Sequence, residues 1–295
     1  MRRIQETTEL AAIAGERASG VTGDEIRFQV CLGASCIASG AEEVAAALKD
    51  ELTGRPAVVE VSGTGCMGPC VHGPLVRVLP AGTVHTQVHP EDVPGIVAAA
   101  YDDDVNPDVP DLTDFFAPQK RVVLQNCGTI DPLSIEDAIE HDAYAALARV
   151  LDEVDPPEII ETLKEAGLRG RGGAGFPTWL KWDLTRRADD DVKFVLCNAD
   201  EGDPGAFMDR SVLEGDPHRL IEGMSIAARC IGARQGVVYV RAEYPLAIER
   251  LEHALGQARE AGLLGEDIMG SGFSFDLEIR RGSGAFVCGE ETALI

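Results

Sequence analysis

The sequence of 295 residues lacks long apolar stretches and is poor in positive charge. It contains no run of about 18 apolar residues, which a membrane-spanning helix would need, and residues 1–20 lack the apolar core of a secretory signal. Lys and Arg number 26 against 50 Asp and Glu, so the formal net charge is −24. Such a charge would repel nucleic acid and an anionic membrane surface. We therefore expect a cytoplasmic protein without membrane insertion and without a nucleic-acid partner.

Composition changes along the chain indicate four parts. Residues 26–101 predict a small α/β unit, with strand-like segments at 26–30 and 57–61 and helices at 41–52 and 90–101. The stretch 101–118 has six Asp, three Pro and no Lys or Arg, which is typical of an extended, solvated connection. We divide the chain into an N-terminal extension 1–25, a domain 26–101, an acidic linker 102–118 and a larger domain 119–295.

The larger domain predicts two helices followed by alternating strands and helices. Ser134 with Asp137 resembles a capping box, and the apolar spacing from Ile135 to Leu151 fits one helix. A second helix should follow Asp155 and end at Gly167. Strands are then expected at 192–196, 236–242 and 273–280, with helices at 218–230 and 245–261 between them. This alternation predicts a largely parallel sheet covered by helices, and hence an α/β fold.

Four of the eight cysteines form two close pairs, Cys31 with Cys36 and Cys66 with Cys70. Without a secretory signal, clustered thiols bind metal or act in catalysis more often than they form disulfides. Both pairs lie in segments rich in small residues, which let backbone N–H groups approach sulfur. Four thiolates suit either a [2Fe-2S] cluster or structural zinc. The spacing favours iron–sulfur, because zinc usually takes tighter C-x2-C pairs, but it does not exclude zinc.

The segments VCLGASCIASG and TGCMGPCVHGPLVRV resemble the thioredoxin-like [2Fe-2S] domain that is fused to flavin subunits of NAD-linked and electron-bifurcating hydrogenases and formate dehydrogenases. The resemblance covers about residues 26–100 and keeps all four thiols. It implies a thioredoxin-like N-terminal domain in which a [2Fe-2S] cluster is bound by Cys31, Cys36, Cys66 and Cys70.

A glycine-rich segment, GLRGRGGAGFPTWLKW from Gly167 to Trp182, contains a G-x-G-x-x-G pattern at Gly170, Gly172 and Gly175. Because a helix, not a strand, is predicted before it, ordinary Rossmann docking of a dinucleotide is not expected. Successive glycines still leave backbone N–H groups free to contact phosphate, and Arg169, Arg171 and Lys181 add positive charge. The alternative is a flexible surface loop.

Polar residues also follow a predicted buried strand, in the segment FVLCNADEGDPGAF. They are Asn198, Asp200, Glu201 and Asp203. The carboxyl ends of parallel strands are where α/β proteins place ligands, although an acidic surface turn could look similar. The later segment SGAFVCGEETALI sets Glu290 and Glu291 behind another short apolar run.

Together the three segments resemble the NADH-dehydrogenating flavoprotein subunit of respiratory complex I and its soluble hydrogenase and formate dehydrogenase relatives, over about residues 120–295. The resemblance implies a Rossmann-like FMN-binding domain, incomplete here, after the [2Fe-2S] domain. Gly202 and Asp203 replace the Ser-Glu frequent in the complex I branch and favour the hydrogenase branch. The residues that would meet the nicotinamide nucleotide are Phe176, Asp203 and Glu291. Those expected around FMN are Gly170, Arg171, Gly172, Gly173, Gly175, Lys181, Asn198, Asp200, Gly289 and Glu290. Glu201 is a further expected cofactor-binding residue.

By this resemblance, FMN would exchange hydride with NAD(H) and pass single electrons to iron–sulfur clusters of a multi-subunit redox complex of the hydrogenase, formate dehydrogenase or complex I type. No catalytic acid or base is required. Partners would be a small thioredoxin-like [2Fe-2S] subunit and an iron–sulfur or catalytic subunit.

The sequence ends at Leu294 and Ile295 inside an apolar, helix-forming stretch without a stop signal, so we expect a C-terminal truncation. The missing part would then include a [4Fe-4S] cluster. A non-catalytic iron–sulfur fragment that binds partner subunits is the alternative function.

Overall fold

The computed structural model describes residues 3–20, 25–54, 59–102, 104–105, 107, 109–171, 173–284 and 294. It divides into two compact units. One, the four-stranded unit, comprises residues 16–138 and 214–216, and the other, the three-stranded unit, comprises the described parts of 1–15, 139–213 and 217–295. Within these described ranges, no helix has the length and apolar character needed to cross a membrane.

The four-stranded unit has the strand order β2-β1-β3-β4. Its strands are β1 Ile26–Cys31, β2 Val59–Thr64, β3 Val76–Leu79 and β4 Thr83–His85. Its helices are α2 Ala34–Ala38, α3 Ala41–Leu52, η1 Cys70–His72, η2 Pro90–Asp92, α4 Val93–Tyr101 and α5 Thr113–Phe116. β1 is parallel to β2 and antiparallel to β3. The strands and helices expected from the sequence of this unit are therefore present.

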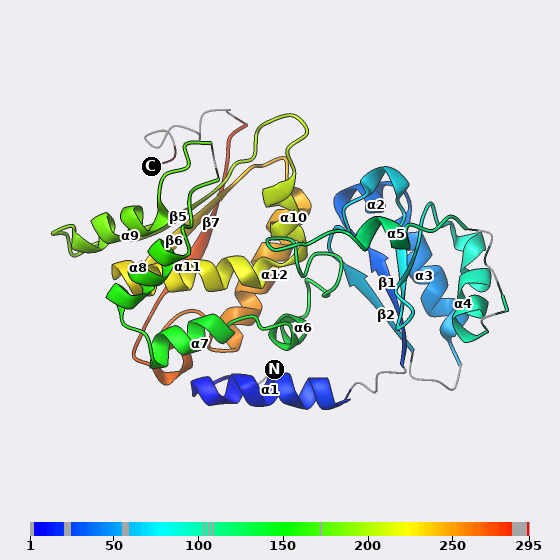
Figure 1. The fold of residues 1–295 in the computed structure, drawn as a ribbon, viewed down its shortest axis with the longest axis horizontal. Coiled ribbons are helices and arrows are strands. Elements are labelled where there is room, and N and C mark those ends of the chain that lie inside the picture. The colour runs from blue at the N-terminus through cyan, green and yellow to red at the C-terminus, as the bar shows by residue number, and fades with distance from the viewer. Residues whose placement is uncertain are drawn as a thin grey trace. The chain divides into compact units, whose positions relative to one another are not determined.

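Helix α3 covers β1 and β2 and packs beside α4 (Figure 1). Its first turn carries Glu42 and Glu43 and its last turn carries Lys49, which matches the direction of the helix dipole. Val44 and Leu48 are four residues apart and therefore share the face that is buried in the core.

Part of the acidic stretch that we expected to be solvated pairs with this unit. His85 of β4 forms a bridge with Asp111, and backbone hydrogen bonds join Thr86 N to Pro110 O (2.9 Å) and Leu112 N to Val84 O (3.0 Å). The reason is the apolar minority in the stretch, because Val109 and Phe116 pack against the core of the unit. The average composition of the stretch does not show that these apolar residues lie between the acidic ones.

The three-stranded unit has a parallel sheet of order β5-β6-β7, as the sequence predicted. Its strands are β5 Phe194–Ala199, β6 Gln235–Val240 and β7 Asp276–Arg281. Its helices are α7 Ala145–Asp152, α8 Pro156–Glu165, α9 Thr178–Arg187, α11 Pro217–Ile231, α12 Pro245–Glu260 and η3 Ile268–Gly270. Three further helices have residues in both units, namely α1 Thr7–Gly20, α6 Ile135–Glu140 and α10 Met208–Gly215. Helix α11 packs on β5 and β6, and α12 packs on β7 (Figure 1).

The single helix predicted from Ile135 to Leu151 is wrong, because the structure has α6 and α7 with a break between them. Ser134 does cap α6, since its Oγ accepts from Asp137 N at 3.1 Å. At the break, Asp142 and Tyr144 adopt left-handed backbone conformations (φ 68° and 66°). The side chain of Tyr144 is fully buried, and its hydroxyl lies 2.7 Å from His218 Nδ1. Burial of this hydrogen-bonded pair stabilises the break, and the apolar spacing of the segment contains no sign of it.

Candidate functional site

The four clustered cysteines lie in two neighbouring loops of the four-stranded unit. Cys31 ends β1 and Cys36 lies in α2, whereas Cys66 follows β2 and Cys70 begins η1. Because β1 and β2 are parallel, with Cys31 in register with Thr64, the loops that follow them leave the same edge of the sheet. The sheet therefore brings together two cysteine pairs that are far apart in the sequence.

Direct contacts join these thiols. Cys66 Sγ and Cys70 Sγ are 3.5 Å apart. A hydrogen bond with Cys36 raises the pKa of the Cys31 thiol to about 12, and the same bond lowers the pKa of Cys36. A hydrogen bond with Cys31 also raises the pKa of Cys66. Cys31 thus contacts one thiol from its own pair and one from the other pair.

Two glycines make room for the thiols. A Cβ atom at Gly33 would lie 2.9 Å from Cys66 Cβ, and one at Gly73 would lie 2.7 Å from Cys36 Sγ. Among the described residues, no three ligating side chains are arranged as a finished site for a metal ion. The fit to a [2Fe-2S] cluster therefore rests on the four-thiol donor set and on the space that the glycines keep free.

The glycine-rich loop lies between α8 and α9, so it follows a helix as expected. Arg169 and Pro177 form a bridge at its base, and Gly170 N donates to Phe176 O at 2.9 Å. The guanidinium of Arg169 donates to Gly175 O at 2.9 Å, so this side chain closes the loop. Its glycines Gly173 and Gly175 have φ of 102° and 62°, and apart from their chain neighbours no atom of the described residues lies within 4 Å of a Cβ placed on either one. The loop is an open backbone surface that a phosphate could approach.

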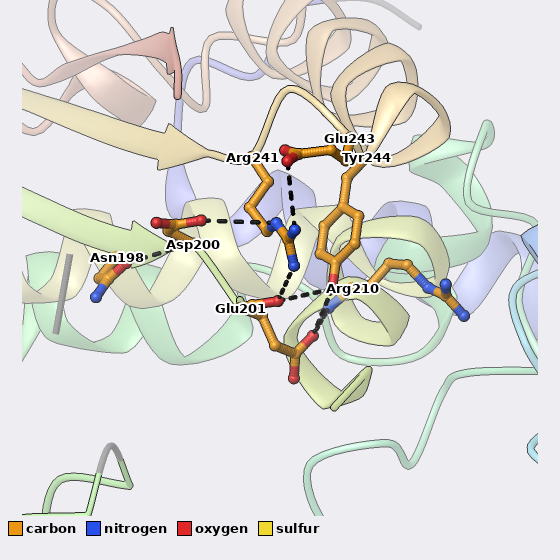
Figure 2. A network of polar contacts seen from close by, with 7 residues as sticks. All are labelled: Asn198, Asp200, Glu201, Arg210, Arg241, Glu243 and Tyr244. Carbon is orange, nitrogen blue, oxygen red and sulfur yellow. Dashed lines mark hydrogen bonds and ion pairs between the residues drawn. The ribbon is translucent and has the colours of Figure 1, made fainter. Parts of the chain in front are cut away.

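A polar network forms where β5 ends, and Figure 2 shows its members. Asn198 Oδ1 accepts from Asp200 N at 3.0 Å. The guanidinium of Arg241 lies 3.7 Å from Asp200 Oδ1 and donates to Glu201 O at 2.6 Å. Tyr244 Oη also donates to Glu201 O, at 3.1 Å. The loop after β5 is thus fixed by two side chains from the connection after β6.

Sequence reasoning missed Arg241 and Tyr244, although a signal for them exists. Both follow β6, the neighbour of β5, and parallel strands end at the same edge of a sheet. Polar residues after any predicted strand of such a sheet are therefore candidates for one site. Burial beside Glu201 raises the pKa of Tyr244, so its hydroxyl remains protonated and able to donate at neutral pH.

Glu201 has a structural role that the sequence did not reveal. Its carboxylate accepts hydrogen bonds from the backbone N–H groups of Asp209 and Arg210, both at 3.1 Å, at the start of α10. A carboxylate at this position satisfies N–H groups that have no partner inside the helix and also faces the positive end of the helix dipole. The side chain of Glu201 therefore caps the start of α10.

The other predicted cofactor residues are placed as follows. Arg171, Phe176, Lys181 and Asp203 have exposed side chains. Among the described residues, Gly170 to Phe176 make no hydrogen bond or ion pair with the network in Figure 2. The structure thus brings together Asn198, Asp200 and Glu201. Gly172, Gly289, Glu290 and Glu291 lie outside the described residues.

Comparisons with known proteins match both parts of the chain. Residues 21–101 match the family described as thioredoxin-like [2Fe-2S] ferredoxin, and residues 163–295 match the Nuo51 FMN-binding domain. HndC, a subunit of the NADP-reducing hydrogenase of Solidesulfovibrio fructosivorans, is 59% identical over 177 residues, which are 60% of this chain and 36% of that protein. A subunit of the NADH-quinone oxidoreductase of Rhizobium meliloti is 49% identical over 174 residues, 59% of this chain and 41% of its own length.

A third relative is the alpha subunit of the NAD-reducing hydrogenase HoxS of Cupriavidus necator, which is 50% identical over 153 residues, 50% of this chain and 25% of its own length. The chain thus spans less than half the length of these curated relatives. The matches confirm the α/β fold class and the two resemblances drawn from the sequence. The chain thus joins a segment similar to the thioredoxin-like [2Fe-2S] ferredoxin family to a segment similar to the Nuo51 FMN-binding domain family.

Proposed function

We propose that this chain exchanges hydride between NAD(H) and FMN and delivers electrons singly through a [2Fe-2S] cluster within a multi-subunit redox complex. The observation that carries the proposal is the presence, on one chain, of an FMN-binding domain and a cluster domain whose four thiols lie in a glycine-lined site. The relatives support it, because they are named as subunits of hydrogenases and of NADH-quinone oxidoreductase.

In this proposal the cluster is held by Cys31, Cys36, Cys66 and Cys70, and FMN is held by the glycine loop and the end of β5. Bound FMN supplies the conversion between a two-electron hydride and single electrons. The open backbone around Gly173 and Gly175 offers N–H groups to the phosphate, and the exposed side chains of Arg171 and Lys181 add positive charge. Arg241 orients the loop that carries Asn198 and Asp200. Gly170, Gly172, Gly289 and Glu290 complete the proposed FMN set.

The nicotinamide nucleotide is assigned to Phe176, Asp203 and Glu291. Phe176 is 45% exposed, so its ring is available for stacking on a flat ligand. The acidic residues favour NADH over NADPH, because the additional 2′-phosphate of NADPH would meet like charge. We further propose a cytoplasmic location. The proposed domains are 26–101 and 119–295, joined by the linker 102–118. The proposed partners are a small thioredoxin-like [2Fe-2S] subunit and an iron–sulfur or catalytic subunit.

The test is to reconstitute the purified 295-residue chain anaerobically with iron, sulfide and FMN. We expect two iron atoms and one flavin per chain, and ferricyanide reduction that depends on NADH. One zinc with no visible absorbance would reject the cluster. A brown protein that takes up iron but neither binds FMN nor oxidises NADH would show a non-catalytic iron–sulfur scaffold instead.

A further inference from the structure

A segment outside both family matches contacts the loop that carries Cys66 and Cys70. Arg121 lies after residues 21–101 and before residues 163–295. Its Nη2 donates to the backbone carbonyl of Met67 at 2.5 Å, and its Nη1 donates to Cys127 O at 3.3 Å. One guanidinium therefore ties the cysteine loop to residues that lie about 60 positions further along the chain. We propose that Arg121 is a positioning residue for the cluster. Arg121 holds the Cys66–Cys70 loop, and its charge raises the reduction potential of the cluster.

Met67 connects this guanidinium to the thiol site. Its N–H donates to Cys31 Sγ at 3.5 Å, and its carbonyl accepts from Arg121. Met67 is fully buried and lies in the loop between Cys66 and Cys70. A change at Arg121 therefore acts on Met67. The backbone of Met67 contacts the proposed ligand Cys31, and its neighbour in the sequence is the proposed ligand Cys66.

Close packing holds the same contact in place. Gly128 has φ of 80°, and a Cβ atom there would lie 2.8 Å from Met67 Cγ and 2.9 Å from its Cα. Arg77 Nη1 donates to Gly128 O at 2.8 Å, and Gln29 Nε2 donates to Thr129 O at 2.5 Å. Gln29 and Arg77 are cross-strand partners on β1 and β3. Two side chains from the sheet thus dock the segment that contains Arg121 onto the four-stranded unit.

The orientation of the guanidinium is restricted as well. The guanidinium carbon of Arg121 lies 5.1 Å from the centroid of the Phe116 ring. The guanidinium carbon of Arg77 lies 5.8 Å from the same centroid. A cation over an aromatic face is attracted by the ring quadrupole, and the planar guanidinium can stack and still donate at its edge. Lysine could supply the charge but not this combination.

The charge of Arg121 bears on the cluster through elementary electrostatics. Four thiolates around two ferric ions and two sulfides give a net negative group, and reduction adds one electron to it. A cation fixed nearby stabilises the more negative, reduced state more than the oxidised one. Removing the cation should therefore make the midpoint potential more negative.

The experiment uses the full chain reconstituted with iron, sulfide and FMN, and it rests on the proposed cluster. The variants are Arg121→Gln, Arg121→Lys and, as a matched control, Lys120→Gln, which removes the same charge from an exposed neighbouring position. Iron content is measured first, and the cluster is then titrated with a reductant and followed by electron paramagnetic resonance. We expect reduction of Arg121→Gln to be about tenfold less favourable, which is about 59 mV more negative for one electron. Arg121→Lys should shift less, and Lys120→Gln should match the unmodified chain.

Loss of iron from Arg121→Gln with retention in Arg121→Lys and Lys120→Gln would also support the positioning role. Equal potentials in Arg121→Gln and the unmodified chain would overturn the proposal, and so would equal shifts in Arg121→Gln and Lys120→Gln. Failure of the unmodified chain to take up iron is a different result, because it would reject the proposed cluster itself.

Discussion

Arg241 donates through Nη1 to the backbone carbonyl of Glu201 at 2.6 Å, so the connection after β6 holds the loop after β5. The contact joins residues that are 40 positions apart in the sequence. It places a cation next to Asp200, and Figure 2 shows that the same guanidinium also reaches Glu243. The geometry of the proposed flavin loop thus depends on a residue that need not touch the flavin.

Replacing Arg241 with Gln should loosen this loop. The loss of charged hydrogen bonds should lower the free energy of unfolding by about 1–3 kcal/mol, and FMN should bind more weakly. Urea denaturation and quenching of flavin fluorescence measure the two effects. Arg281→Gln is the control, because Arg281 forms only an exposed ion pair with Glu252 among its described contacts. Unchanged FMN affinity in Arg241→Gln would show that the loop does not contribute to the flavin site.

Glu201 should act on stability through α10. Glu201→Ala removes both acceptors for the N–H groups of Asp209 and Arg210, and such a loss of capping costs about 0.5–2 kcal/mol. Glu201→Gln keeps one acceptor and should cost less. Thermal unfolding of both variants without flavin gives the comparison. Equal stability of Glu201→Ala and the unmodified chain would contradict the capping role.

His218 should make stability depend on pH. Burial lowers its pKa to about 4 in the folded chain, with Nε2 3.2 Å from Gln257 Oε1. Since the unfolded chain binds the proton first as the pH falls, the stabilisation is complete above about pH 6.5. It then declines toward about pH 4, by roughly 3 kcal/mol.

Urea denaturation across this range of pH measures the decline. His218→Gln should remove this part of the pH dependence, whereas His72→Gln, at an exposed position, should retain it. The same slope in all three proteins would mean that His218 does not titrate differently on folding.

The sequence could predict the elements but not the contacts between distant segments. The parallel sheet and the helices α11 and α12 follow from apolar periodicity and turn residues, which are local signals. The paired cysteines are also visible by spacing. By contrast, the left-handed turn at Tyr144 depends on His218, which lies 74 residues away. The pattern of residues near Tyr144 cannot predict a partner so far away in the sequence.

The candidate site shows the same limit. Asn198 and Asp200 could be found because polar residues after a buried strand have a positional meaning. The capping role of Glu201 could not, because nothing local shows that its carboxylate turns toward α10. Arg121 could not be found either, because it contacts a carbonyl 54 positions earlier in the chain. The sequence placed Arg121 just after the acidic linker, at the start of the larger domain, and gave it no role.

Substitution of the cysteines should separate ligands from bystanders. Cys36→Ser and Cys66→Ser should abolish the visible absorbance and lower the iron content, because each removes one thiolate of the four. Cys127→Ser should keep the cluster. Cys127 is buried against Gly215, and its contact with the cysteine loop runs through its carbonyl and Arg121. Iron loss in Cys127→Ser, with the fold intact by circular dichroism, would contradict the assignment of four ligands.

Asp203→Asn tests the proposed nucleotide site. Asp203 is exposed, so its repulsion of a 2′-phosphate is screened, and the gain in NADPH use relative to NADH should be about fivefold or less. The ratio of kcat/KM for the two nucleotides reports this difference. Loss of FMN in Asp203→Asn would move the residue to the flavin side. An unchanged ratio would remove it from the nucleotide site.

The pairing of Gln29 with Arg77 across β1 and β3 also predicts an order of folding events. Both side chains donate to the carbonyls of residues 128 and 129, and a register slip of one residue in either strand would turn one of them to the opposite face. We therefore expect the segment to dock after the antiparallel pair has formed correctly. Amide protons in residues 126–130 should acquire protection from hydrogen exchange later than those of β1, which makes this segment a late reporter of native strand pairing.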